Sequence, residues 1–173
     1  MSVCLIGPQS LAELRTLAIQ SFSQISDHLP AKAPLQVPLY LEQQQQLQLN
    51  IKPHKSSNRL VISFALPDIQ PWYRYKVVSF VAHLLGDEGP GSLLALLKQQ
   101  GLVNQLSAGG GIDGSNYKDF TLAFELTVAG RQQYRQIVQT LFAKVRLLKD
   151  SPFPANLFAE RQKLLNWAYR FYE

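Results

Sequence analysis

The segment from Phe120 to Val128 has the most regular hydrophobic pattern in the chain. Phe120, Leu122, Phe124, Leu126 and Val128 recur at every second position. Because side chains alternate between the two faces of a strand, this period of two predicts an antiparallel strand with one buried face. A second layer of structure must then cover that face.

Four further segments are predicted to be strands. Residues 47–51 and 60–66 alternate in the same way, and the glutamines at 43–46 are expected to be the polar start of the first of them. Residues 102–108 form a strand that leads into a glycine-rich turn. The apolar run at residues 2–6 ends at Gly-Pro and is expected to be a buried strand.

Apolar residues at helical spacing predict the remaining elements. Ser10 and Glu13 form a capping box at the start of the first helix, and Gly101 is placed to end another in the left-handed conformation. Pro154 suits the first turn of the last helix. The expected helices cover residues 11–25, 71–85, 92–100, 128–149 and those from 154 onward.

Strands therefore cluster with hairpin-like connections, and helices follow in blocks. This order predicts an α+β fold with two layers, an antiparallel (or mixed) sheet covered by helices. Prolines at positions 30, 34 and 38 favour an extended path, so residues 28–42 are the expected linker between two domains.

The formal net charge of +5 comes from 17 lysine and arginine residues against 12 acidic ones. The basic residues late in the chain alternate with apolar positions, which favours a solvated helix face, and a preference for anionic partners is the alternative. No RNA-binding or zinc-finger pattern is present, so nucleic acid is not an expected partner. The sequence contains no run of about 18 apolar residues, so no membrane span is expected. The late basic residues are Arg131, Arg135, Lys144, Arg146, Lys149, Arg161, Lys163 and Arg170.

No catalytic constellation can be assembled from the sequence. The histidines at positions 28, 54 and 83 lack a second histidine four residues on, so neither H-x-x-E-H nor H-E-x-x-H occurs. There is no G-x-S-x-G elbow, and the glycine-rich loop at 86–91 follows a predicted helix rather than a strand. The single Cys4 excludes an internal disulfide and is expected to be a small core residue. We therefore expect no catalytic residue, no metal ligand and no cofactor in this chain.

One segment resembles a known family. Residues 83–94 read H-L-L-G-D-E-G-P-G-S-L-L, and Lys98 to Gly101 and Val103-Asn104 follow at matching spacing. This pattern is similar to the insulinase/pitrilysin zinc metallopeptidases, the family of insulin-degrading enzyme, protease III and coenzyme PQQ synthesis protein F. The opening segment S-V-C-L-I-G-P-Q-S-L and the stretch from Asn156 to Phe171 also match in order, so the resemblance covers nearly the whole chain.

The resemblance implies a domain assignment. Residues 1–27 would close the preceding catalytic domain, residues 28–42 would be the linker, and residues 43–173 would be the front of a non-catalytic, peptidase-like domain. Zinc would be held in the catalytic domain of the parent protein, before residue 1. The implied partners are peptide substrates and that catalytic domain of the same parent chain. A periplasmic location is favoured by the family, with the cytoplasm as the alternative.

The resemblance also implies an exosite that anchors the amino end of a bound peptide. A carboxylate such as Glu88 can receive an ammonium group through a charge-assisted hydrogen bond. The edge strand at 106–110 can accept an extended peptide by adding it to the sheet. The matching positions are His83, Gly86, Glu88, Leu106, Ala108 and Gly110.

Purely structural roles for the same residues remain open as alternatives to peptide binding. The glycines at 86–91 can simply make a turn between two helices, His83 can cap a helix or make a buried hydrogen bond, and the glycines at 109–111 can form a hairpin turn rather than a binding loop. For the whole chain, the alternatives are a purely structural inactive subunit, as in processing peptidase or the bc1 complex, and an independent peptide-binding module.

Overall fold

The computed structural model describes residues 3–26, 40–114 and 117–172. The chain divides into two compact units, Met1–Pro34 and Leu35–Glu173. Most of the predicted linker, residues 28–39, lies outside the described residues. The assignment of the units to domains of a longer protein stays a prediction.

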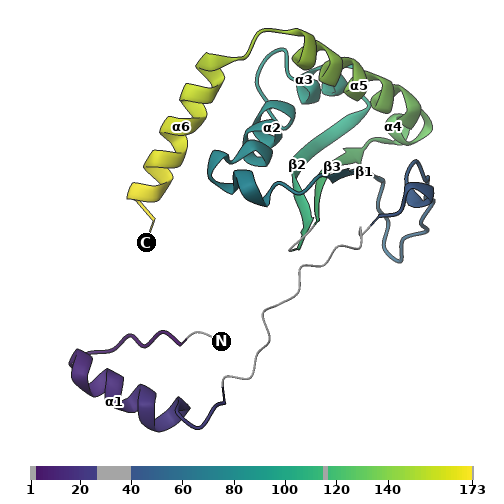
Figure 1. Ribbon diagram of the computed structural model, residues 1–173. Helices are drawn as coiled ribbons and strands as arrows, with labels where there is room; N and C mark the ends of the chain where they lie inside the picture. Colours follow the sequence, from purple (N-terminus) through teal and green to yellow (C-terminus); the bar gives the residue numbers. More distant parts are fainter. Residues whose placement is uncertain (1–2, 27–39, 115–116, 173) are drawn as a thin grey trace. The chain divides into compact units, whose positions relative to one another are not determined.

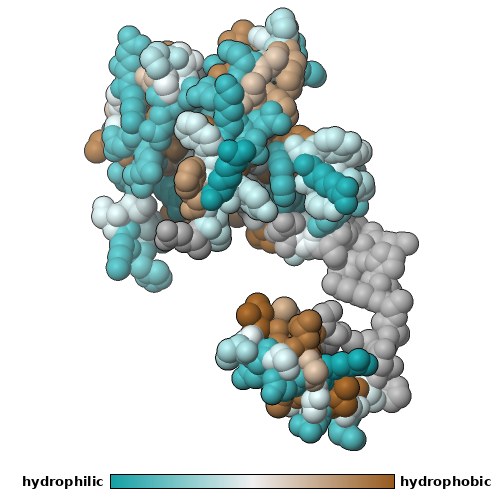
Figure 2. Space-filling view, turned by 90° about the vertical axis from the view of Figure 1, so that its left-hand side faces the viewer, coloured by the Kyte–Doolittle hydropathy of each residue, from teal (hydrophilic) through white to brown (hydrophobic). Residues whose placement is uncertain are grey.

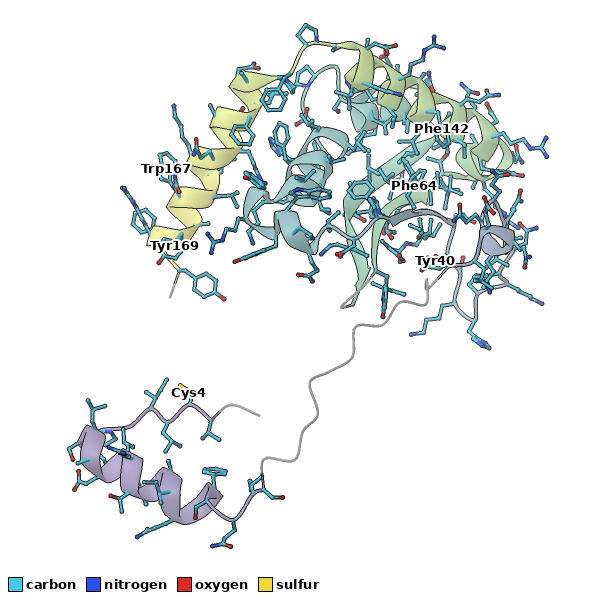
Figure 3. The ribbon with its side chains drawn as sticks, viewed as in Figure 1. Cys4, Tyr40, Phe64, Phe142, Trp167 and Tyr169 are labelled. Atoms are coloured by element: carbon cyan, nitrogen blue, oxygen red, sulfur yellow. The ribbon has the colours of Figure 1, made fainter. Side chains whose placement is uncertain are left out.

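The first unit is built around helix α1 (Leu11–Phe22). The predicted capping box is confirmed, because Ser10 Oγ accepts from the Glu13 amide at 3.3 Å and the Glu13 carboxylate accepts from the Ser10 amide at 2.8 Å. The strand expected at residues 2–6 is wrong over residues 3–6, which pair with no other described segment. Cys4 is exposed rather than part of a core (Figure 3).

No described residue of this unit is buried, and Ile6 and Leu11 are 95% and 86% exposed. Figure 2 shows hydrophobic side chains on its surface. One helix cannot enclose a core by itself, since a helix buries its apolar face only against another element.

The second unit contains a three-stranded antiparallel sheet (Figure 1). Strand β3 (Lys118–Leu126) lies between β1 (Arg59–Leu66) and β2 (Val103–Asp113) in the described residues. The predicted strands at 60–66 and 120–128 are confirmed, although the second ends at Leu126. The α+β class is therefore confirmed.

The strand predicted at 47–51 and the turn predicted at 109–111 are wrong, whereas the strand predicted at 102–108 is confirmed from Val103 onward as part of β2. Residues 47–51 form no strand, and their alternating apolar side chains are 66–81% exposed because no described strand pairs with them. The 310-helix Glu42–Gln44 replaces the expected strand start. The glycines at 109–111 are not a turn but lie within β2, where Gly109 pairs with Thr121 and Gly110 with Phe120.

The predicted helix at 71–85 is divided by Lys76, whose φ of 51° is left-handed. A 310-helix (Gln70–Tyr75) precedes this residue and α2 (Val77–Leu85) follows it. Helix α3 (Leu93–Gln99) and the left-handed Gly101 (φ 68°) confirm the predictions for that segment. In Figure 1, these helices lie on the same side of the sheet.

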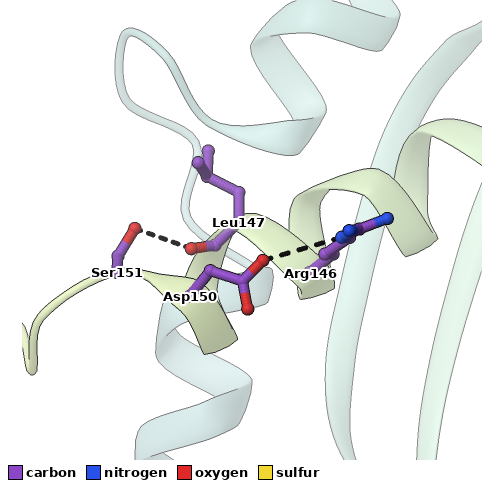
Figure 4. Close-up of polar contacts among 4 residues, drawn as sticks. All are labelled: Arg146, Leu147, Asp150 and Ser151. Carbon is purple, nitrogen blue, oxygen red and sulfur yellow. Dashed lines mark hydrogen bonds and ion pairs between the residues drawn. The ribbon is translucent and has the colours of Figure 1, made fainter.

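The helix predicted over 128–149 is likewise broken, at Gln133, into α4 (Val128–Gln132) and α5 (Tyr134–Asp150). Figure 4 shows the end of α5, where Ser151 Oγ donates to the Leu147 carbonyl at 2.6 Å. The nearby ion pair of Arg146 and Asp150 spans 3.6 Å and is largely exposed, so it contributes only about 0–1 kcal/mol.

Helix α6 (Ala155–Arg170) follows directly after Pro154. It is attached to α2 by an aromatic cluster, in which the ring of Phe80 lies 5.2 Å from Phe158 and 5.8 Å from Phe153 between centroids. None of the helices in the described part of the chain combines the length and hydrophobicity that crossing a bilayer requires.

The core lies between the helices and one face of the sheet. Phe124 and Leu122 of β3 are almost fully buried, and each such side chain contributes about 1.5–3 kcal/mol. Phe64 of β1 meets Phe142 of α5 edge to face, with centroids 6.1 Å apart (Figure 3). The buried cluster consists of Leu85, Leu93, Leu94, Leu97, Leu102, Val103, Leu106, Phe120, Leu122, Phe124, Leu126, Ile137 and Leu141.

On the other face of the sheet, Asp119 is 4% exposed and its Oδ2 accepts a hydrogen bond from Tyr40 at 2.8 Å. This hydrogen bond raises the pKa of the Tyr40 hydroxyl above its usual value, because only the protonated phenol can donate it to the carboxylate. Tyr40 therefore attaches the segment before β1 to the central strand (Figure 3).

Gly130 of α4 allows a close approach to the carbonyl of Leu102, and a Cβ at this position would overlap that oxygen. The variant Gly130→Ala is expected to lower the free energy of unfolding by about 1–3 kcal/mol or more, since the obstructing group is backbone. Gly109→Ala is the matched control, because a Cβ there meets nothing within 4 Å. Urea unfolding followed by circular dichroism measures both, and equal stability of the two variants would contradict this packing.

Candidate functional site

A groove of about 820 Å³ lies beside strand β2. Three consecutive residues of the strand, Ala108, Gly109 and Gly110, line it. Since successive side chains of a strand point to opposite faces, a groove that touches all three runs along the edge of the strand. The other lining residues are Asp68, Ile69, Gln70, Trp72, Tyr73, Lys76, Val77, Val78, Ser79, Ala82, His83, Gly114, Tyr117, Lys118 and Arg161.

β2 is an edge strand, because the described sheet places β3 on one side of it and no strand on the other. Its small residues leave the backbone accessible. A Cβ added at Gly110 would lie 3.3 Å from the Lys118 side chain, 3.8 Å from Val78 and 4.0 Å from the Asp119 carbonyl oxygen, whereas one at Gly109 would meet nothing within 4 Å. Such an edge presents amide and carbonyl groups to which an extended chain can bind.

The structure brings three of the six predicted site residues together. His83, Ala108 and Gly110 all line the groove. Gly86 lies next to it, since a Cβ there would stand 3.3 Å from the Ala108 Cβ. Their role in binding stays a prediction.

The other two predicted residues are placed differently. Leu106 is 4% exposed as a whole residue and belongs to the core, and it does not line the groove. Glu88 is exposed on the loop after α2 and does not line the groove. Any anchoring by Glu88 would therefore take place in a solvated position.

The structural interpretation of the loop at 86–91 is supported. The Gly89 amide donates to Asp87 Oδ1 at 3.3 Å, and Gly91 has a φ of 79°. Ser92 Oγ then caps α3 by accepting from the Ala95 amide at 3.0 Å. Lys144 of α5 donates to the Gly91 carbonyl at 3.3 Å. The loop is therefore a turn between α2 and α3 that these hydrogen bonds stabilise, and it holds the backbone of Glu88 in a defined place.

His83 lies in the last turn of α2 and is half-buried. The expected hydrogen bond of this side chain is not found with any described residue. Its imidazole is therefore available to the groove that it lines.

The groove also contains residues that the sequence interpretation missed. Trp72 and Tyr73 come from the 310-helix before α2, and Lys76 is the residue that precedes the first turn of α2. Arg161 reaches the groove from α6. Of the late basic residues, six are exposed as predicted, whereas Lys144 and Arg161 are half-buried. No local pattern distinguishes these two, because the distinction depends on where each helix packs.

Among residues 3–26, 40–114 and 117–172, no group of three or more histidine, cysteine, aspartate or glutamate side chains is arranged to hold a metal ion. The groove instead offers backbone, aromatic and cationic groups. These suit the binding of a polar, extended ligand.

The architecture matches a known class of peptidase domain. The crystal structure of pitrilysin aligns with 95% of this chain and 18% of its own, with a TM-score of 0.83 and 24% sequence identity. This similarity establishes the fold of an insulinase-like peptidase domain.

The chain belongs to the peptidase M16 family, because the model of the Peptidase M16 inactive domain matches residues 1–165. A-factor-processing enzyme of Saccharomyces cerevisiae is 32% identical over 176 residues, which cover 99% of this chain and 17% of that enzyme. Human insulin-degrading enzyme is 31% identical over 172 residues, which likewise cover 99% of this chain and 17% of that enzyme. The chain thus spans about a sixth of the length of these relatives.

Gly86 tests the contact between the loop and the strand. In Gly86→Ala, the new Cβ would stand 2.8 Å from the Ala82 carbonyl oxygen, so the loop must move. We expect a loss of about 1–3 kcal/mol in the free energy of unfolding, measured by urea titration. Gly89→Ala in the same loop is the control, since its nearest contact, with the Asp87 carboxylate at 3.5 Å, is ordinary. A smaller loss for Gly86→Ala than for the control would refute the close approach.

Proposed function

We propose that this chain is the non-catalytic, substrate-binding region of an insulinase-like zinc metalloendopeptidase. Its membership of the inactive-domain family supports the first half of the proposal. The groove along β2 supports the second half, since it gives an extended peptide both a strand edge and side-chain contacts. In this account, the chain contributes binding and geometry, and no catalytic group.

The open edge of β2 is the observation that carries the proposal. A peptide added to this edge would form main-chain hydrogen bonds regardless of its sequence, and its alternate side chains would enter or leave the groove. Ala108, Gly109 and Gly110 present almost no side-chain bulk, so the two backbones can approach closely.

The free amino end of the peptide is the second element of the proposal. Glu88 would accept its ammonium group from the braced loop at 86–91. Because Glu88 is exposed, the interaction is screened by water and contributes at most about 1 kcal/mol. The strand edge would then supply most of the affinity, and Glu88 would set the register.

In the parent protein, zinc would be held by the preceding catalytic domain, to which residues 1–27 would belong. The exposed apolar residues of the first unit fit this assignment, since they need cover from another part of a domain. Holding a peptide at a fixed distance from the metal raises efficiency by orientation. A periplasmic location follows from the family alone and is part of the proposal.

Fluorescence polarisation with labelled extended peptides tests the amino-end anchor. Glu88→Gln is expected to weaken binding of peptides with a free amino end by up to about fivefold and to leave their N-acetylated forms unchanged. Asp87→Asn removes an equal charge from the same loop and keeps an acceptor for the Gly89 amide, so it should have little effect. Equal binding of both peptide forms by the native chain would contradict the anchor, and no binding at all would favour a purely structural role.

A further inference from the structure

Arg161 of α6 is a half-buried cation with an unsatisfied donor. Its Nε atom is buried and has no hydrogen-bond partner among the described residues. Among the described residues, its one hydrogen bond is with Ser79 Oγ, to which Nη2 donates at 3.3 Å. No carboxylate of the described residues forms an ion pair with it. The guanidinium is thus partly removed from water without a counter-charge.

A half-buried charge in this state is destabilising, because its lost hydration is not replaced by a partner. The other cations of α6 avoid this penalty: Lys163 and Arg170 are exposed. An anion in the groove would supply the missing interaction.

The surroundings of Arg161 favour the same kind of ligand. Lys76 also lines the groove, and Asp68 is the acidic side chain of the described lining. Asp68 is exposed, and its Oδ1 already accepts the Gln70 amide at 2.9 Å. The described lining therefore carries an excess of positive charge beside an open strand edge.

We infer that Arg161 selects peptides that carry an acidic side chain, aspartate or glutamate, at the position that faces the groove when the peptide lies along β2. The inference rests on the proposed function and adds substrate selectivity to it. The carboxylate would accept hydrogen bonds from the guanidinium fork, which binds this planar group well. Lys76 would add longer-range attraction.

A peptide is favoured over a nucleic acid by the shape of the lining. The groove follows the backbone of β2 through three consecutive residues, which fits a chain able to form strand hydrogen bonds. An acidic side chain that projects from such a chain would lie on the same groove as its backbone. A single fixed register would bring one carboxylate to Arg161.

The test is a binding scan on the 173-residue chain. The scan uses short labelled peptides with free amino ends, each with one glutamate, and the glutamate occupies a different position in each peptide. For every position, a peptide with glutamine in place of the glutamate is the uncharged control. At one position, the glutamate peptide should bind about tenfold more tightly than the glutamine peptide. This preference should decrease as salt is raised.

Variants then assign the preference to the residue. Arg161→Glu should reverse it, so that lysine at the same position binds best, and Arg161→Gln should abolish it. Arg161→Lys should retain part of it, since the charge remains. Lys163→Glu makes the same charge change at an exposed position of α6 and should leave the preference intact. Circular dichroism shows that each variant is folded.

The outcomes separate the two proposals. Peptide binding without a glutamate preference, or a preference that persists in both Arg161→Glu and Arg161→Gln, overturns the role of Arg161 and leaves the peptide-binding function standing. Absence of binding by every peptide overturns both. A glutamate preference that Arg161→Glu reverses supports both.

Discussion

The second unit depends on the double pairing of β3. This strand is hydrogen-bonded to β1 on one side and β2 on the other, and its apolar face is the floor of the core. Phe124 and Leu122 bury almost all of their surface under the helices. Because β3 takes the central position, β2 lies at the edge, and no strand of the described chain pairs with its outer backbone groups. The open edge, which the proposed function uses for peptide binding, is thus a direct consequence of the strand order that forms the core.

Much of this fold could be predicted from local patterns. The alternation at 120–126 and 60–66 located two strands, and the capping residues Ser10 and Gly101 set helix ends correctly. The failures share a cause. Residues 47–51 alternate equally well but have no neighbour to pair with, and the glycines at 109–111 continue a strand because β3 supplies the pairing. Strand formation depends on a partner, which a local pattern does not contain.

The candidate site, like the fold, could be predicted from the sequence only in part. His83, Ala108 and Gly110 could be named from the family pattern, and the structure gathers them on one groove. Arg161 could not, because in sequence it is one of eight late basic residues at helical spacing. Only the packing of α6 against α2, through Phe158 and Phe80, places it beside the strand edge and removes part of its hydration. Half-buried charge is a property of tertiary structure, and the inference about Arg161 rests on it.

The central claim is that the open edge of β2 pairs with an extended peptide. Amide hydrogen exchange, with and without a saturating peptide, measures this directly. The account predicts slower exchange at those backbone amides of residues 106–112 that do not bond to β3, while the amides of α5 are unchanged. Unchanged exchange along β2 in a chain that is demonstrably bound to peptide would contradict the account.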